Sequence, residues 1–96
     1  MQHFTVTLTG SAQVLGAGKS IQGKAKSVLI QADGANANLV FIGAVGTTLD
    51  SSDYGYRIEI PAATIPSQPL ILPLADPMKI QVLGTNTQKV HVLVIY

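Results

Sequence analysis

The segment Gly16–Ser20 reads Gly-Ala-Gly-Lys-Ser and contains the Gly-Lys-Ser ending of a phosphate-binding loop. In such a loop, backbone N–H groups surround the phosphates at the start of a helix, and a further glycine is required upstream. That glycine would fall at position 13, which is Gln13, and the chain from Ile21 onward leads into a predicted strand. We therefore interpret the segment as a glycine turn and not as a nucleotide site.

Metal binding and proton transfer would depend on few side chains. The two histidines are His3 and His91, and the nearest acidic candidates are Asp50, Asp53 and Asp76. No two histidines stand at a ligand spacing such as i, i+4 on a helix. We expect no metal site and no catalytic site, and we interpret His91 as a packed or rim side chain of the last strand.

Serine and aspartate also occur without the context that chemistry needs. The segment Asp50–Asp53 could offer oxygens to calcium, but it lacks the carboxylate density of strong sites, and a solvated turn is favoured. No Gly-x-Ser-x-Gly elbow is present to mark a serine hydrolase. The chain is therefore expected to be a non-enzymatic protein without a cofactor.

Three neighbouring side chains could form a binding platform. Tyr54 and Tyr56 are two residues apart, so on a strand they would project to one face, with Arg57 on the opposite face. Such a pair suits a carbohydrate platform or a protein contact, and it equally suits two tyrosines that pack at the end of a sandwich. Both interpretations stay open at the level of the sequence.

The composition favours contact with other protein over contact with nucleic acid. Charged residues make up 11% of the chain, against a usual share of about 25%. The charge is replaced by hydroxyl, amide and glycine residues, which cost less to desolvate than unpaired charges. A neutral surface without an interface is the alternative interpretation. The net charge is +1, and the largest basic cluster is Lys19, Lys24 and Lys26, so nucleic acid is not an expected partner.

Cysteine content and hydropathy restrict the remaining possibilities. The chain has no cysteine, which excludes disulfides and thiolate metal sites. No apolar run approaches the roughly 20 residues that cross a bilayer, and Met1–His3 leads straight into a strand. We expect one soluble domain over residues 1–96 with no membrane partner and no processed leader.

The segment Ser27–Gly43 gives the clearest structural pattern. Two apolar runs, Ser27–Ala32 and Asn38–Gly43, flank a loop of aspartate, glycine and asparagine, which predicts an antiparallel hairpin. Both runs are apolar on most of both sides, so we place both strands centrally in a sheet and not on the binding surface.

The rest of the chain predicts short strands and almost no helix. Apolar and polar residues alternate in several segments, and turn residues separate them every 8–12 residues or so. Five prolines lie between Pro61 and Pro77, which predicts a connecting arm with short edge segments. The expected strands outside the hairpin are His3–Thr9, Ala12–Leu15, Tyr56–Ile60, Leu70–Leu72, Met78–Leu83 and Lys89–Tyr96. The predicted fold is all-β, an antiparallel sandwich of jelly-roll or Greek-key type with about seven to eight strands.

The order of several short motifs resembles small virion proteins of tailed bacteriophages and prophages, of the head decoration or cement type. The resemblance rests on Gln13–Leu15, Ser27–Ala32, Asn36–Gly43, Ile80–Asn86 and the closing strand Val90–Tyr96. It implies an all-β subunit attached to the outside of a phage head, where it binds the major capsid protein as a decoration or cement protein, or a related small component of head or tail, with no catalytic residues. A monomer that assembles only on the capsid lattice and a preformed trimer or other oligomer both stay open. The proline-rich arm departs from the pattern, in which this stretch is richer in glycine.

The sequence therefore predicts a virion structural protein, and the alternative is a receptor- or carbohydrate-binding module of a tail, spike or head fibre. Function is expected at the less regular edges, which are the N-terminal strand, the turn at Asp50–Arg57 and the proline arm. The candidate interface residues are Phe4, Asp53, Tyr54, Tyr56, Arg57, Pro66 and Pro69.

Overall fold

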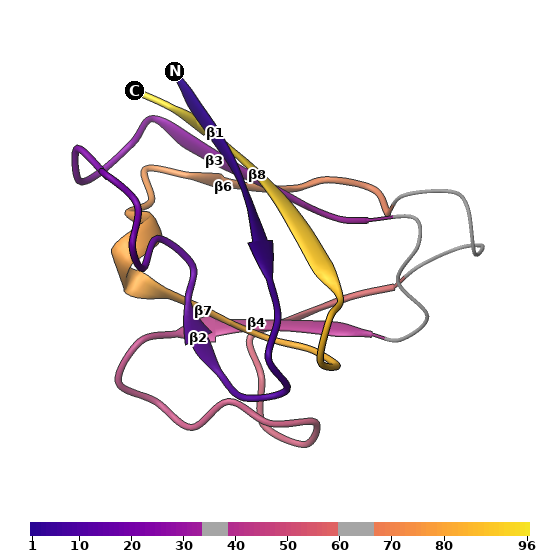
Figure 1. Ribbon diagram of the computed structural model, residues 1–96. Coiled ribbons are helices and arrows are strands. Elements are labelled where there is room, and N and C mark those ends of the chain that lie inside the picture. The colour runs from indigo at the N-terminus through magenta and orange to yellow at the C-terminus, as the bar shows by residue number, and fades with distance from the viewer. Residues whose placement is uncertain (34–38, 60–66) are drawn as a thin grey trace.

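The structure, a computed structural model, describes residues 1–33, 39–59 and 67–96. These residues form two antiparallel four-stranded sheets, drawn as an upper and a lower layer in Figure 1. The strands are β1 (Gln2–Thr7), β2 (Gln13–Val14), β3 (Ser27–Ala32), β4 (Val40–Ala44), β5 (Tyr56–Ile58), β6 (Leu70–Pro73), β7 (Ile80–Leu83) and β8 (Lys89–Ile95). The predicted all-β fold is confirmed.

The strand order is that of a jelly roll. The first sheet runs β1-β8-β3-β6 and the second β2-β7-β4-β5. Four of the pairings, β1 with β8, β2 with β7, β3 with β6 and β4 with β5, would make one long hairpin of eight strands. The other two, β3 with β8 and β4 with β7, form when that hairpin rolls up on itself. Rolling produces two sheets, as in the jelly rolls of viral capsid and lectin domains.

Alternating side chains from both sheets build one core. In β8 every second residue, Val90, Val92 and Val94, is buried, because successive side chains of a strand point to opposite faces. The buried cluster also contains Val28 and Ile30 of the first sheet and Val40, Ile42, Ile80 and Val82 of the second. The strand β8 lies between β1 and β3, so this segment is tied into the core.

The predicted hairpin at Ser27–Gly43 is wrong. Its two strands lie in different sheets, since β3 pairs with β6 and β8 whereas β4 pairs with β5 and β7. Each is nevertheless an inner strand of its sheet, so the central placement is confirmed. A polar loop between two apolar runs permits a hairpin or a crossing between layers, and local sequence does not separate the two.

The described part of the proline arm agrees with its prediction. The strand β6 is an edge strand, and Pro73 stands at its end. A 3₁₀ turn, η1 (Pro77–Lys79), follows and is capped by Asp76, whose carboxylate accepts the backbone N–H of Met78 at 2.9 Å. No helix among the described residues is long and apolar enough to cross a membrane.

Candidate protein-binding surfaces

The outer face of the first sheet carries an apolar patch. The register places His3, Leu93, Leu29 and Ile71 side by side across all four strands. These residues face away from the core, because their neighbours along each strand are the more buried ones. We define the Leu93 patch as Leu29, Ile71 and Leu93 together with Pro69. Ile71 is 57% exposed, a large fraction for an isoleucine on a strand.

A shallow hollow of about 360 Å³ lies in this face. Leu29, Leu93 and Pro69 give it apolar walls, and His3, His91 and Gln31 give it a polar rim. An apolar hollow with a few polar groups at its rim is the usual form of a contact site for another molecule.

The His91 side chain is held from both sides at this rim. Its Nδ1 lies 3.1 Å from the Thr5 hydroxyl, and its Nε2 lies 3.4 Å from Oδ1 of Asp33. The order hydroxyl, imidazole, carboxylate is that of a hydrolase triad. Backbone N–H groups of a sheet lie in the plane of the sheet, however, so these strands aim no donors at an oxyanion above the Thr5 hydroxyl. The arrangement fixes the orientation of His91.

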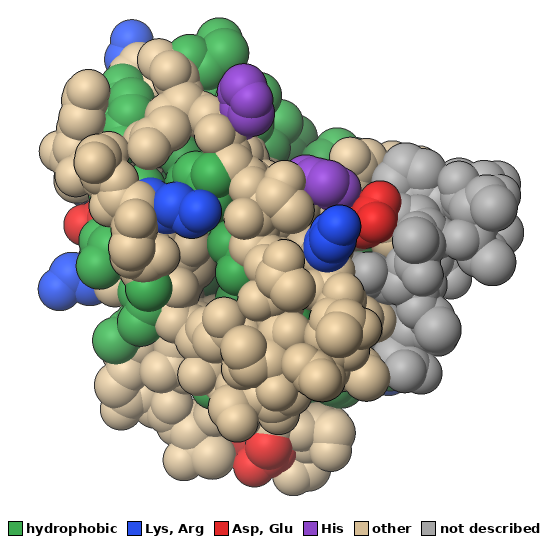
Figure 2. All heavy atoms as spheres, in the orientation of Figure 1, with side chains coloured by type: hydrophobic (Ala, Val, Ile, Leu, Met, Phe, Trp, Pro, Cys, Tyr) green, Lys and Arg blue, Asp and Glu red, His purple; other side chains and the backbone are tan. Residues whose placement is uncertain are grey.

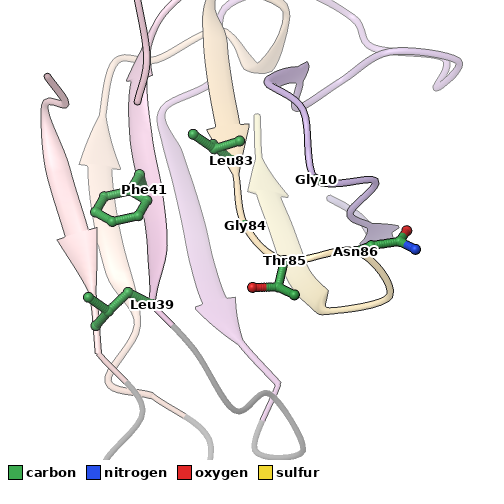
Figure 3. A pocket seen from close by; sticks show the side chains of 7 residues that line it. All are labelled: Gly10, Leu39, Phe41, Leu83, Gly84, Thr85 and Asn86. Carbon is green, nitrogen blue, oxygen red and sulfur yellow. The ribbon is translucent and has the colours of Figure 1, made fainter. Parts of the chain in front are cut away.

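The outer face of the second sheet has a groove of about 470 Å³, shown in Figure 3. We define the Phe41 groove by its lining residues, which are Gly10, Leu39, Phe41, Leu83, Gly84, Thr85 and Asn86. Phe41 and Leu83 are register partners on neighbouring strands, and the Tyr54 ring packs beside Phe41 with ring centroids 5.0 Å apart at 47°. This face therefore also presents apolar and aromatic side chains outside the core.

Gly84 shapes the floor of the Phe41 groove. A Cβ atom at this position would lie 2.5 Å from Cδ1 of Leu8 and 2.7 Å from Oε1 of Gln88. Only a glycine lets the backbone approach these side chains so closely. The turn that follows reverses the chain into β8 and contains Thr87 at φ 75°.

The turn at Asp50–Asp53 is closed by one carboxylate. Oδ1 of Asp50 accepts hydrogen bonds at 2.8 Å from the Ser52 hydroxyl, the Ser52 N–H and the Asp53 N–H. These donors, the Ser52 hydroxyl first, hold the pKa of the Asp50 carboxyl below its ordinary value of 3.8. Its oxygen is thus occupied by the turn itself. No group of three or more metal-ligating side chains occurs among residues 1–33, 39–59 and 67–96.

The structure separates the two tyrosines predicted to share a face. Tyr56 is the register partner of Ile42, which is buried, and so lies on the core side at the start of the edge strand β5, 51% exposed. Tyr54 instead packs on Phe41, which faces outward. Arg57 is the register partner of Phe41 and forms an ion pair of 2.8 Å with Glu59. The outward platform therefore consists of Tyr54, Phe41 and Arg57.

The remaining predicted interface residues are dispersed. Phe4 faces inward and packs against the core, with Nζ of Lys19 5.4 Å from its ring centroid. Asp53 is exposed in the turn, and Pro69 lines the hollow of the Leu93 patch. Pro66 lies outside the described residues.

Sequence reasoning missed the apolar residues of the two outer faces, above all Leu29, Leu93 and Phe41. The signal was present, because these strands are apolar at odd and even positions alike. For the strands at Ser27–Ala32 and Asn38–Gly43, this pattern predicts a central position in a sheet, away from the binding surface. In a fold of two layers, it indicates an outer face suited to a partner.

Comparisons of the chain with protein-family models, with curated proteins and with solved structures give no match.

Proposed function

We propose that this chain is a non-enzymatic structural subunit of a tailed-bacteriophage virion, which attaches to the outer surface of the head and binds the major capsid protein. The observation that supports this most is the apolar character of both outer sheet faces. An antiparallel sheet in an isolated domain usually has one apolar and one polar face. The Leu93 patch and the Phe41 groove depart from that rule, and a covering partner accounts for the departure.

The mechanism follows from the kind of surface available. Covering leucine and isoleucine side chains with a partner is favourable, because apolar surface leaves water. Burying amide and hydroxyl groups costs far less free energy than burying unpaired charges. Many copies on one lattice each add a modest binding free energy, and together they hold neighbouring capsid subunits against separation. The jelly-roll topology, common in viral capsid domains, fits this role.

The test is the protein composition of purified particles, measured by quantitative mass spectrometry. We expect many copies per particle for the wild-type chain and at least tenfold fewer for Ile71→Asp, which places a charge in the Leu93 patch. Val45→Asp is the matched control, because Val45 is also an exposed apolar residue, at 39%, and lies outside both surfaces. Absence of the wild-type chain from particles would refute the proposal.

A second candidate function is a carbohydrate- or receptor-binding module of a tail, spike or head fibre. It is favoured by the outward platform of Tyr54, Phe41 and Arg57, because sugars stack on aromatic rings and bind charged donors at their hydroxyls. Under this function, Tyr54→Ala abolishes binding on a glycan array, and Tyr56→Ala, on the other side of the sheet, preserves it. No response of the wild-type chain on the array would dispose of this candidate.

A further inference from the structure

The free edge of β1 is the most open strand edge in the described part of the molecule. The backbone N–H of Leu8 donates to Gln88 at 2.8 Å, toward β8. Since N–H directions alternate along a strand, the backbone N–H groups of Phe4 and Val6 also point toward β8. The backbone N–H groups of His3, Thr5 and Thr7 point toward the free edge. No described residue hydrogen-bonds the backbone of His3 or Thr5 on that side, whereas the Gln13 amide donates to the Thr7 carbonyl at 3.4 Å.

The other edges of the two sheets are protected. Directly after β6, the backbone N–H of Leu74 donates to the carbonyl of Lys26 on the β3 side. Because backbone directions alternate, the backbone of positions 69, 71 and 73 is turned toward the free edge. Two of these three residues are prolines. Proline removes the donor that a docking strand would need. The edge strands β2 and β5 span two and three residues, and β5 contains Arg57, which forms an ion pair with Glu59. Short and charged edges are poor templates for pairing.

By contrast, the residues of β1 themselves carry none of these protections, and the charge nearest to Phe4 is the Lys19 ammonium over its ring. The strand spans six residues, Gln2–Thr7, and contains no proline, lysine, arginine or acidic residue. In Figure 1 it crosses in front of β8, and Figure 2 shows that uncharged polar atoms and backbone cover most of this side of the molecule. A long, uncharged edge strand pairs readily with another strand of matching pattern.

We propose that the occupant of this edge is β1 of a second copy, paired antiparallel across a two-fold axis beside Phe4. In this register Phe4 faces Phe4 of the second copy, and each His3 faces a Thr5 of the other copy. Each His3–Thr5 pair exchanges both of its backbone N–H···O bonds, which satisfies the unpaired groups of this edge. The Gln13 contact marks the end of the free stretch and stays intact.

The side chains of β1 are complementary to themselves in this register. On the core side, the half-buried Phe4, which has the Lys19 ammonium on its ring, gains a second aromatic ring as neighbour. On the outer side, His3 and Thr5 meet without like charges. The result is one eight-stranded sheet with a Leu93 patch in each half, an interface in which both copies use the same residues.

The first test is the solution mass of the purified chain by light scattering and sedimentation equilibrium. We expect twice the 10.0 kDa chain mass for the wild type and for Thr5→Val, which keeps the N–H. Thr5→Pro removes a backbone donor that points toward the free edge and not toward β8. We therefore expect this variant to have the mass of a single chain and to keep the circular dichroism spectrum of the folded protein. Ile71→Pro makes the same change on the opposite edge of the same sheet, and this variant remains a dimer.

The second test determines which residues of the two β1 strands are paired. It uses cysteine variants, so it remains valid even where a proline variant does not fold. Paired residues of this kind have Cα atoms about 5.5 Å apart, within the range of about 4.4–6.8 Å that a disulfide bridges. The wild-type chain has no cysteine. A mixture of His3→Cys and Thr5→Cys chains therefore forms mixed disulfide dimers, identified by mass, in excess over the homodimers that either variant forms alone.

A wild-type chain that is monomeric at all concentrations would overturn the inference and would leave the edge to a strand of another protein. A folded Thr5→Pro dimer, or dissociation of Ile71→Pro, would overturn the assignment to β1. Both tests use the purified chain alone, so their failure does not bear on the proposed virion role, and absence from particles does not bear on the dimer.

Discussion

At Asp50 a single carboxylate oxygen accepts three hydrogen bonds, and it closes a four-residue turn without help from the core. The composition of Asp50–Asp53 was enough to predict a surface turn. That Asp50 closes it follows a local rule, because an aspartate side chain at the start of a turn accepts the backbone N–H two residues on. The contacts of His91 with Thr5 and Asp33 could not be predicted from the sequence, because they join β8, β1 and the residue after β3, which are far apart in the chain.

The Asp50 turn gives a prediction on pH. The folded-state pKa is lowered, so the ionised carboxylate stabilises the turn at pH values above 3.8, and this stabilisation is lost as the pH falls through the depressed value. The carboxyl ¹³C resonance of Asp50 should titrate below 3.8, and Ser52→Ala should move the midpoint upward. Ser51→Ala is the control and should leave it unchanged. Equal midpoints for wild type and Ser52→Ala would contradict the assignment of the donor.

Gly84 gives a prediction on stability. In Gly84→Ala the new methyl group meets Leu8 and the Gln88 amide at overlapping distances, and overpacking of this kind costs about 1–3 kcal/mol. Urea denaturation should show this loss. Gly18→Ala, where no atom lies within 4 Å of the new Cβ, should lose only the roughly 1 kcal/mol of a positive φ at a non-glycine residue. A larger loss at Gly18 than at Gly84 would count against close packing as the cause.

At the scale of elements, strand positions could be predicted and strand partners could not. Alternation located β1, β5 and β8, and apolar runs beside turn residues located β3 and β4, because both are local properties of the chain. Which strands pair depends on contacts with segments that lie far away in the sequence. The loop after β3 was interpreted as a hairpin turn, yet β8, from the far end of the sequence, takes the place beside β3. The candidate site suffered the same limit, since the Leu93 patch is assembled from three strands that are distant in sequence.

Ser67 gives a prediction at the end of a strand. It is 3% exposed, and its hydroxyl oxygen accepts the backbone N–H of Ala32 at 2.9 Å, which continues the contact of β6 with β3 beyond the ladder. Ser67→Ala leaves that buried N–H without an acceptor and should cost about 1–3 kcal/mol in the free energy of unfolding. Thr47→Ala, which removes an exposed hydroxyl bond to Ala44, is the control and should cost less. Rapid hydrogen exchange of the Ala32 amide in Ser67→Ala, but not in Thr47→Ala, would show that the loss of stability comes from this hydrogen bond.

At the scale of the whole molecule, the low charge content gives a prediction on how attachment responds to salt. If attachment to particles uses the apolar outer faces, it should depend weakly on ionic strength. From about 0.1 to 1 M NaCl the Debye length falls from about 10 to 3 Å, and the copy number per particle should stay within about twofold. Sedimentation of particles followed by quantification of bound chain measures this. Release of most copies by salt would indicate that charged contacts dominate.

The rolled-hairpin topology also affects how the chain folds. The outermost pairing joins β1 to β8, the two ends of the described chain, whereas β4 and β5 are the paired strands closest in sequence. Pairings between distant segments form slowly, because a long loop must close before they gain any stabilisation. Among the described strands, the neighbour of β1 within its sheet is therefore β8, which comes after all the others in chain order and is synthesised after them. Until β8 is synthesised, β1, the least protected edge strand in the described part of the chain, has no strand of that part beside it, and unpaired strand edges of this kind expose nascent chains to aggregation.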